Sequence, residues 1–324
     1  MTPIAFLTGA SGFVGFHIIN GLLQQGYKVV AAVRKSSDVR HLAGMDIQFV
    51  YPDFNNKESL AKELAAAHIT HIVHVAGITK GRTQEDYNHA NATITQNLAL
   101  AAMQAGIDLQ CFVFISSLAA MGPSLGKPLS ESEVPHPVTF YGKSKLLAEK
   151  YLAEIPDFPF TILRPTAVYG PRDKDMFILI KSVKRGLEGF ISHAKQQLSF
   201  LYVKDLANAV MLSLQHPATR KAYFVSDGGV YSQYDFSDTT KEILHKKTLR
   251  IYVGKTLVKG IAWFLGKSNP KKAPVINADK VKEITGNWDI SIENIQKDLG
   301  FQPQYNLQEG LKESIDWYRE NGWL

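Results

Sequence analysis

The sequence predicts an α/β protein with a doubly wound parallel sheet and a smaller, mainly helical lobe that closes over a substrate site. Three observations lead to this prediction. Strand-like and helix-like segments alternate through residues 1–165, as in parallel sheets with right-handed crossovers. The strand expected at 28–33 reads as apolar, which is typical of a strand covered by helices on both faces. The chain also opens with a strand, a glycine-rich turn and a helix in direct succession.

The opening stretch joins a strand at 4–7 to a helix at 13–25 through three glycines. Gly9 allows a tight turn, Gly12 lets the backbone approach a pyrophosphate, and Gly15 lets the helix pack close to the strand. The phosphates are expected on the free amides at the N-terminus of the helix. Glycines also mark ordinary turns, but here a strand precedes them and a helix follows. Besides the glycines, the expected cofactor contacts in this dinucleotide site are Ser11, Phe13 and Val14.

The other elements follow in order along the chain. After the strand at 28–33, strands are expected at 47–51, 70–77, 110–115 and 160–163, and helices at 57–67, 84–105 and from 140 onward. The pattern then loosens into a helix at 176–185, a strand at 198–203, a helix at 204–215, a strand at 221–225 and a last helix at 307–319. We expect residues 1–165 and 195–228 to form the dinucleotide-binding domain, and 166–194 and 229–324 to form the lobe.

Parallel sheets of this kind bind ligands at the carboxyl ends of their strands. Six residues fall at expected strand ends and can therefore line one crevice: Gly9, Arg34, Asp53, Ala76, Ser117 and Pro165.

The bulk composition is that of an ordinary soluble globular protein, with 45% hydrophobic and 20% charged residues. The single cysteine, Cys111, lies in an apolar strand, which favours a buried packing role and a reducing compartment. The first strand starts within a few residues of Met1, which leaves no room for a signal peptide, so we expect a cytoplasmic protein.

Positive charge is concentrated in residues 241–272, where nine Lys or Arg residues stand against one acid, Glu242. This segment could face an anionic substrate, nucleic acid or, weakly, a membrane surface. Its stretch 254–266 is amphipathic but too short to span a bilayer. A packed helix with solvated lysines is the simpler alternative.

Tyr141 and Lys145 are four residues apart on the helix expected from residue 140, so their side chains share one face. An ammonium at about 4 Å can lower the pKa of a tyrosine from about 10 toward neutrality, which would make it a general acid or base. Ser117 could donate a hydrogen bond to the same substrate oxygen. Such a Tyr/Lys pair is common on helices, but here it accompanies a strand-end serine and a glycine-rich opening. Together they predict an acid–base site.

Seven segments carry a resemblance to a known family: 8–15, 74–77, 91–97, 116–117, 141–145, 164–172 and 202–205. In these segments the chain resembles an extended short-chain dehydrogenase/reductase of the NAD-dependent epimerase/dehydratase type. It is similar in character to dihydroflavonol reductases and 3β-hydroxysteroid dehydrogenases. The resemblance implies a Rossmann domain and an NAD(P)-dependent enzyme with Ser117, Tyr141 and Lys145 as its catalytic residues.

The resemblance also implies cofactor contacts by position. Asp53 and Phe54 would contact the adenine, and Pro165 and Val168 would lie near the nicotinamide. Lys145 would hold the nicotinamide ribose, beside Tyr141, and Asn91 would support the active-site end of its helix. The remaining expected contacts are Val75, Ala76, Gly77 and Ser116.

NAD-specific members of this family carry an acid at the end of the second strand, whereas this chain has Arg34, followed by Lys35. A guanidinium can bind a 2′-phosphate through two hydrogen bonds and stack on adenine. We therefore expect NADP(H) to be favoured over NAD(H). The alternative is an arginine that only covers the adenine of NAD.

Motifs of two related reactions are missing. Sugar-nucleotide dehydratases of the family have an acidic pair after the catalytic hydroxyl residue, where this chain has Leu118 and Ala119. Epimerases often grip the diphosphate with an arginine at the position of Leu198, and the expected late Arg-x-Gly-Asp segment is absent from 276–290. Either Lys181, Lys184 and Arg185 or the basic segment could replace these arginines.

The leading hypothesis is therefore an NADP(H)-dependent oxidoreductase that acts on a carbonyl or secondary alcohol with Tyr141 as the acid–base group. The alternatives are a nucleotide-sugar epimerase that retains its cofactor and a nucleotide-binding scaffold without activity. We expect a small-molecule substrate, a homodimer as the resemblance implies, and no nucleic acid. His68, His71 and His74 cluster in sequence, but no cysteine or carboxylate set completes a metal site, so packing roles are expected.

Overall fold

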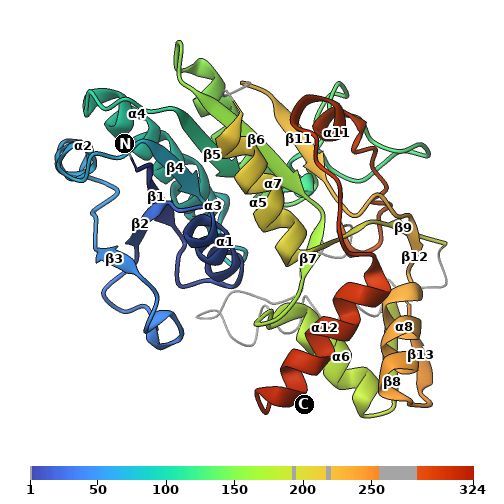
Figure 1. The fold of residues 1–324 in the computed structure, drawn as a ribbon. Helices are drawn as coiled ribbons and strands as arrows, with labels where there is room; N and C mark the ends of the chain where they lie inside the picture. Colours follow the sequence, from blue (N-terminus) through green and yellow to red (C-terminus); the bar gives the residue numbers. More distant parts are fainter. Residues whose placement is uncertain (1, 192–194, 217–219, 255–282) are drawn as a thin grey trace.

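A computed structural model describes residues 2–191, 195–216, 220–254 and 283–324. Its centre is a seven-stranded sheet in the order β11-β6-β5-β4-β1-β2-β3, in which every pair of neighbours is parallel (Figure 1). The strands are β1 (Ile4–Thr8), β2 (Lys28–Ala32), β3 (Ile47–Val50), β4 (His71–His74), β5 (Cys111–Ile115), β6 (Phe160–Pro165) and β11 (Ala222–Val225). This order confirms the predicted doubly wound sheet.

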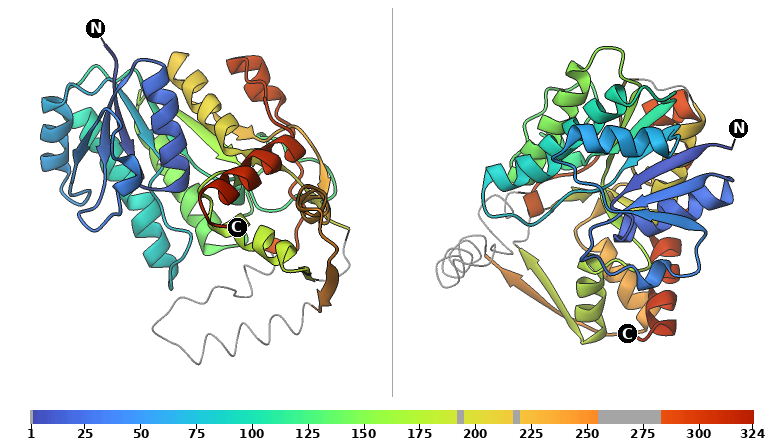
Figure 2. Two further views of the ribbon diagram at one scale, coloured as in Figure 1. Left: turned by 60° about the horizontal axis from the view of Figure 1, so that its bottom comes forward. Right: turned by 90° about the vertical axis from the view of Figure 1, so that its left-hand side faces the viewer.

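Helices cover both faces of the sheet, as Figures 1 and 2 show. On one face lie α1 (Phe13–Gln24) and α7 (Val203–Gln215), whose apolar side chains share a core with the sheet. On the other face lie α2 (Lys57–Ala66), α4 (Ile94–Gln104) and α5 (Phe140–Glu154). Because both faces are covered, β5 is buried along its whole length, and Cys111 packs in the core as expected.

The long helix expected at 84–105 is interrupted. It consists of α3 (Gln84–Asn88), a π-helical turn (His89–Thr93) and α4. The strand expected at 198–203 is likewise split into β9 (Gln197–Leu198) and β10 (Phe200–Tyr202). π-helical turns are frequent at functional sites, and this one carries Asn91.

The lobe is built around α6 (Asp175–Lys184), α8 (Asp235–Leu244) and α12 (Leu307–Glu320), which enclose a core of their own. Three two-stranded sheets accompany these helices: β7 (Ala167–Tyr169) with β10, β9 with β12 (Tyr231–Ser232), and β8 (Leu187–Ile191) with β13 (Leu249–Val253). The strands β8 and β13 were not expected from the sequence.

One part of the expected lobe packs with the sheet instead. The helix α11 (Glu293–Leu299) lies against β11, and its residues Ile295 and Leu299 belong to the core of the sheet. No helix in the described parts of the chain is long and apolar enough to cross a membrane. Most of the basic segment, 255–272, lies outside the described residues.

Candidate active site

The turn between β1 and α1 requires its glycines. Gly9 has a φ of +73°, and a Cβ there would lie 2.9 Å from the amide nitrogen of Ala76 at the end of β4. A Cβ on Gly15 would collide with the carbonyl of Gly9. Gly12 caps α1 without a side-chain hydrogen bond, and the first turn of α1 contains no acid. These features leave the amides at the N-terminus of α1 open to a pyrophosphate, so the turn fits a dinucleotide.

A close approach between α5 and the 3₁₀ turn η3 (Leu118–Ala120) brings the catalytic candidates together. A Cβ on Gly142 would collide with the carbonyl of Ala119, so only glycine permits this approach. Thr139 caps α5 by accepting a hydrogen bond from the Gly142 amide at 3.0 Å. The sequence interpretation did not single out Gly142, although its place directly after Tyr141 was a usable signal.

The side chains of Tyr141 and Ser117 interact at this junction. Ser117 Oγ also accepts a hydrogen bond from the amide of Ala119 at 3.2 Å, which fixes its orientation. Burial raises the pKa of Tyr141 to about 12, while the neighbouring Ser117 hydroxyl acts in the opposite direction. The expectation that Lys145 lowers the pKa of this phenol is therefore wrong for this structure.

The Lys145 ammonium does not lower the pKa of Tyr141 because it binds other groups. Its Nζ donates a hydrogen bond to the carbonyl of Ile115 at 2.9 Å and lies 4.7 Å from the centre of the Phe114 ring. A Cβ on Gly77 would lie 3.3 Å from the same Nζ. Burial lowers the pKa of Lys145 to about 8. The ammonium thus borders the strand-end backbone where the resemblance expects the nicotinamide ribose.

Asn91, on the π-helical turn, ties the crevice wall to α5. Its side chain accepts a hydrogen bond from the Ile78 amide at 2.7 Å and donates to the Ile78 carbonyl and to Ser144 Oγ. Ser144 in turn donates to the carbonyl of Tyr141 at 2.7 Å. This agrees with a supporting role for Asn91 at the active-site end of its helix.

A buried polar chain that the sequence interpretation missed extends this support to the glycine turn. Thr8 Oγ1 accepts hydrogen bonds from the two amides that follow β4, so it donates to His74 Nδ1 at 2.7 Å. His74 Nε2 then donates to Thr95 Oγ1, which donates to the Asn91 carbonyl. Burial lowers the pKa of His74 to about 3, so it is neutral and keeps this tautomer. His74 therefore does more than the packing expected of it.

A buried ion pair holds α5 on the sheet. Arg164, on β6, donates to both carboxylate oxygens of Glu149, and the two side chains are only 8% and 5% exposed. Ser116 Oγ donates to the same carboxylate at 2.5 Å. The hydroxyl of Ser116 is thus used inside the protein, which leaves its backbone to line the expected cofactor site. Glu149 lies four residues after Lys145 on α5, a spacing that the sequence interpretation overlooked.

A cavity of about 240 Å³ opens beside Ser117. Most of its lining is apolar, and Glu283 is the one charged side chain among the described residues that line it. Leu198, the position where an arginine grips the diphosphate in related epimerases, is part of this wall. The twelve lining residues are Ser117, Leu118, Ala119, Pro165, Thr166, Ala167, Leu198, Ser199, Phe200, Glu283, Ile284 and Trp288.

At the other end of the crevice, Arg34 lies just beyond β2 in an exposed turn closed by a hydrogen bond from the Ser37 amide to its carbonyl. Its guanidinium makes no hydrogen bond or ion pair with the described residues. Asp53, also exposed, accepts two hydrogen bonds from Asn55. Lys35 is exposed and Phe54 is half-buried beside them. Pro165 and Val168 lie toward the cavity end, buried and half-buried respectively.

The model of the NAD dependent epimerase/dehydratase family matches residues 5–226. The chain belongs to this family. It is 30% identical to the UDP-glucose 4-epimerase of Vibrio cholerae over 97% of this chain and 95% of that protein. It is 26% identical to the 3-beta-hydroxysteroid dehydrogenase of Mycolicibacterium neoaurum, covering 97% and 91% of the two proteins. The structure of MoeE5 in complex with UDP-glucose and NAD matches with a TM-score of 0.77 at 26% identity, over 98% of this chain and 99% of that one.

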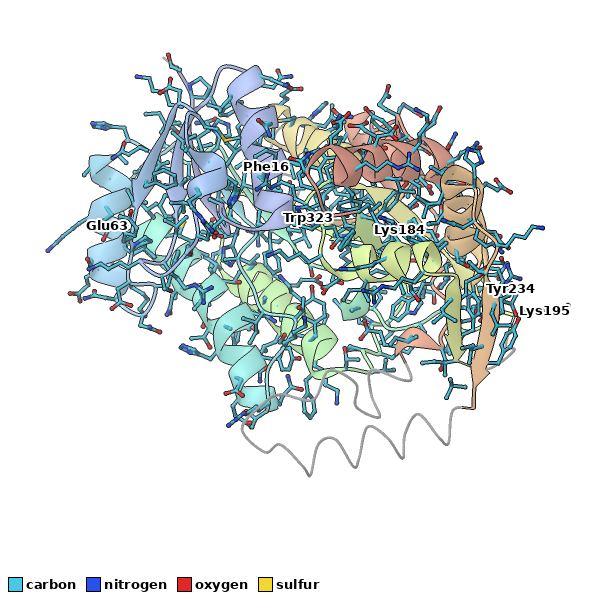
Figure 3. All side chains as sticks on the ribbon, turned by 90° about the horizontal axis from the view of Figure 1, so that it is seen from below. Phe16, Glu63, Lys184, Lys195, Tyr234 and Trp323 are labelled. Atoms are coloured by element: carbon cyan, nitrogen blue, oxygen red, sulfur yellow. The ribbon has the colours of Figure 1, made fainter. Side chains whose placement is uncertain are left out.

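Membership confirms the resemblance to extended short-chain dehydrogenase/reductases, a family of enzymes that use nicotinamide dinucleotides. None of the three cations that could replace the missing arginines, Lys181, Lys184 and Arg185, lines this cavity. Lys184 lies in the lobe, on the other side of the molecule from Glu63 on α2 (Figure 3). Within the described parts of the chain, no group of three or more His, Cys, Asp or Glu side chains could hold a metal ion.

Proposed function

We propose that this family member transfers hydride between a nicotinamide cofactor and the carbon of a carbonyl or secondary alcohol, with Tyr141 exchanging the proton. The observation that carries the proposal is the Ser117 hydroxyl in the cavity wall next to the Tyr141 side chain, which the close approach of α5 at Gly142 brings there. The bound nicotinamide supplies or accepts the hydride, and the residues of this chain handle the oxygen of the substrate.

Tyr141 is suited to protonate a substrate oxygen. With its pKa raised to about 12, the phenol is protonated at neutral pH and can donate to the carbonyl oxygen as the carbon is reduced. Ser117 lies within reach of the same oxygen as a second hydrogen-bond donor. In the reverse direction, a nearby cation must stabilise the phenolate that removes the alcohol proton. Here the Lys145 ammonium binds the Ile115 carbonyl and does not lower the pKa of Tyr141, so this arrangement favours the reduction of a carbonyl.

Two complete reactions contain this step, and different observations favour them. The epimerase alternative is favoured by the relatives: the first is named a UDP-glucose 4-epimerase, and MoeE5 is described with UDP-glucose and NAD. These names support an epimerase that retains its cofactor better than they support the oxidoreductase that the sequence ranks first.

The oxidoreductase is favoured by the chemistry of the cavity. Its lining is mainly apolar, Leu198 stands where a phosphate-binding arginine would be, and the Glu283 carboxylate would repel a diphosphate. These features suit a compact apolar substrate, in keeping with the steroid named for the Mycolicibacterium relative. Net reduction of a ketone or aldehyde is the reaction expected from such a site.

The deciding experiment is cofactor stoichiometry. Net cofactor oxidation with apolar ketones identifies the oxidoreductase, whereas conversion of a UDP-, GDP- or dTDP-sugar without net redox change identifies the epimerase. For either reaction, Tyr141→Phe should lower kcat by about 10²- to 10⁴-fold, because only the proton donor is removed, and leave cofactor binding intact. Tight cofactor binding without activity on either substrate class would favour the scaffold alternative.

We further propose that NADP(H) is the preferred form of the cofactor, because Arg34 is exposed beyond β2 where an acid would otherwise bind the ribose. Arg34→Ala should weaken NADPH binding by about tenfold to hundredfold and change NADH binding little. Calorimetric titration of both cofactors measures this effect. Arg40→Ala is the matched control, since Arg40 is also exposed but pairs with Asp38. Equal affinity for the two cofactors in the wild type would contradict the proposal.

A further inference from the structure

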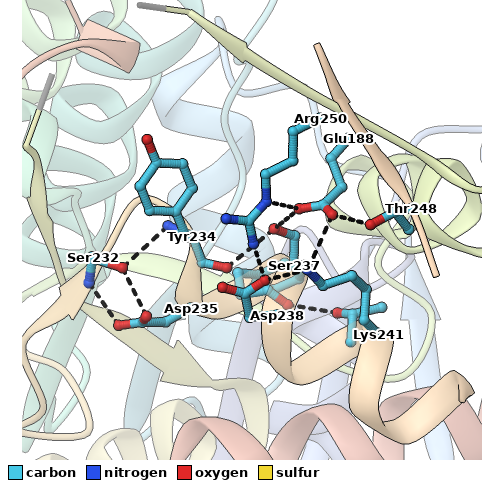
Figure 4. Close-up of polar contacts among 11 residues, drawn as sticks. Glu188, Ser232, Tyr234, Asp235, Ser237, Asp238, Lys241, Thr248 and Arg250 are labelled. Carbon is cyan, nitrogen blue, oxygen red and sulfur yellow. Dashed lines mark hydrogen bonds and ion pairs between the residues drawn. The ribbon is translucent and has the colours of Figure 1, made fainter. Parts of the chain in front are cut away.

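In the parallel pair β8–β13 of the lobe, the charged face is turned inward and the apolar face is turned outward, which is the reverse of an ordinary surface strand. The register places Glu188 beside Arg250, and both contribute to a charged cluster that faces α8 (Figure 4). Side chains alternate along a strand, so the neighbouring positions point to the other face. That outer face is entirely apolar and carries Leu187, Ile191, Leu249, Ile251 and Val253, with Gly189.

The outer face is open. Leu187, Leu249 and Ile251 are 44%, 65% and 45% exposed, and the register places Leu249 directly opposite Leu187. Large apolar side chains scattered singly on a surface are ordinary, but a contiguous exposed apolar sheet face marks an interaction site. The polar face packs on the rest of the lobe, whereas these three apolar side chains stay exposed in the part of the chain that the structure describes.

Cations border this face at one end. Lys184 and Arg185 lie three and two residues before the start of β8, and Lys246 and Lys247 lie three and two residues before the start of β13. The Leu249 amide donates to the Gly186 carbonyl at 2.8 Å, which holds the two basic turns side by side. All four cations are exposed, and none forms an ion pair with the described residues. The partner should therefore offer negative charge next to an apolar layer.

We propose that this face docks the lobe onto an anionic phospholipid surface. The apolar side chains enter the boundary between headgroups and acyl chains, while the four cations lie among the headgroup phosphates. A nucleic acid would match the cations but not the leucines and isoleucine between them.

The test is sedimentation of the full-length protein with vesicles of phosphatidylcholine, alone or with about one third phosphatidylglycerol. The wild type should bind the anionic vesicles and be released by high salt. Leu249→Glu/Ile251→Glu should reduce binding at least about tenfold, because it removes the inserted side chains and adds repulsion. Lys184→Glu/Lys247→Glu should reduce it at least about tenfold as well.

Lys57→Glu/Lys62→Glu is the matched control. It makes the same change in net charge on the exposed side of α2, at the far end of the molecule from the lobe (Figure 3), and should leave binding unchanged. Binding that ignores lipid charge, or that survives both lobe variants, overturns the proposal. So does a wild-type dimer that Leu249→Glu dissociates, because a second copy then covers the face. The proposal is also wrong if the wild type does not bind vesicles and its β13 amides are protected from hydrogen exchange, because other residues of the chain then cover the face.

Discussion

Glu149, on helix α5 of the domain built around the sheet, and Glu188, on β8 of the lobe, are both buried carboxylates that bind an arginine, but their partners differ. Arg164, the partner of Glu149, is 8% exposed and makes two hydrogen bonds to it. The cations around Glu188 remain in contact with water: Lys241 is 23% and Arg250 is 32% exposed. The ion pair of Glu149 is therefore closed to water, whereas the charged cluster around Glu188 in the lobe is open to it.

The surroundings explain this difference. Glu149 is on the same helix as Tyr141 and Lys145, and its pair with Arg164 holds that helix on β6 beside the cavity. Glu188 accepts hydrogen bonds from Ser237 and Thr248 and holds β8, β13 and α8 together (Figure 4). Buried charge thus positions catalytic side chains in the sheet, whereas in the lobe it leaves an apolar face pointing outward. Breaking each cluster should have different consequences.

The largest effect is expected in the sheet. Glu149→Gln removes one member of a fully buried pair and leaves the Arg164 charge uncompensated, so the free energy of unfolding should fall by about 3–5 kcal/mol. Activity should fall too, because α5 carries Tyr141. Urea denaturation, with kcat measured well below the midpoint, tests both. A decrease of less than about 1 kcal/mol in the free energy of unfolding would contradict this, because the pair would then contribute no more than an exposed surface ion pair.

The second effect concerns Lys145, whose pKa falls from 10.5 to about 8 because it is buried in the sheet region. Between these values the unfolded chain holds the proton and the folded chain does not, so this group makes stability rise with pH by about 3 kcal/mol. Lys145→Met should abolish that rise. Denaturation of both proteins from pH 7 to 10 measures it, and parallel curves for the two would contradict the assignment.

Much of the sheet region is predictable because local rules specify it. The glycine turn, the apolar parallel strands and the Tyr141/Lys145 spacing each follow from short stretches of sequence. Ser117 was found because strand ends converge in such sheets. The contacts that support these residues are not predictable in this way. Thr8 binds His74, which is 66 residues further along the chain, and Asn91 binds Ser144, which is 53 residues further along. Such pairs depend on tertiary packing, which a local pattern does not encode.

The lobe was harder to predict for a different reason. Residues 187–191 alternate imperfectly, and alternation identifies two faces without stating which one is buried. The ordinary assumption puts the apolar face inside, but here the charged cluster of Glu188 occupies that side. The substrate cavity raised the same difficulty, because Glu283 and Trp288 join Leu198 there from the far end of the sequence.

The smallest effect is expected from Glu188→Gln in the lobe. Burial alone would raise the pKa of Glu188, but hydrogen bonds from Thr248, Ser237 and Lys241 outweigh burial and hold it below its usual value. Because the surrounding cations reach water, losing the carboxylate charge should cost only about 1–3 kcal/mol. The cost should shrink as the pH falls and the wild-type carboxylate is protonated. Since this cluster lies outside the cavity, kcat should be unchanged. A drop in kcat at full folding would show that the lobe cluster positions catalytic groups as the sheet cluster does.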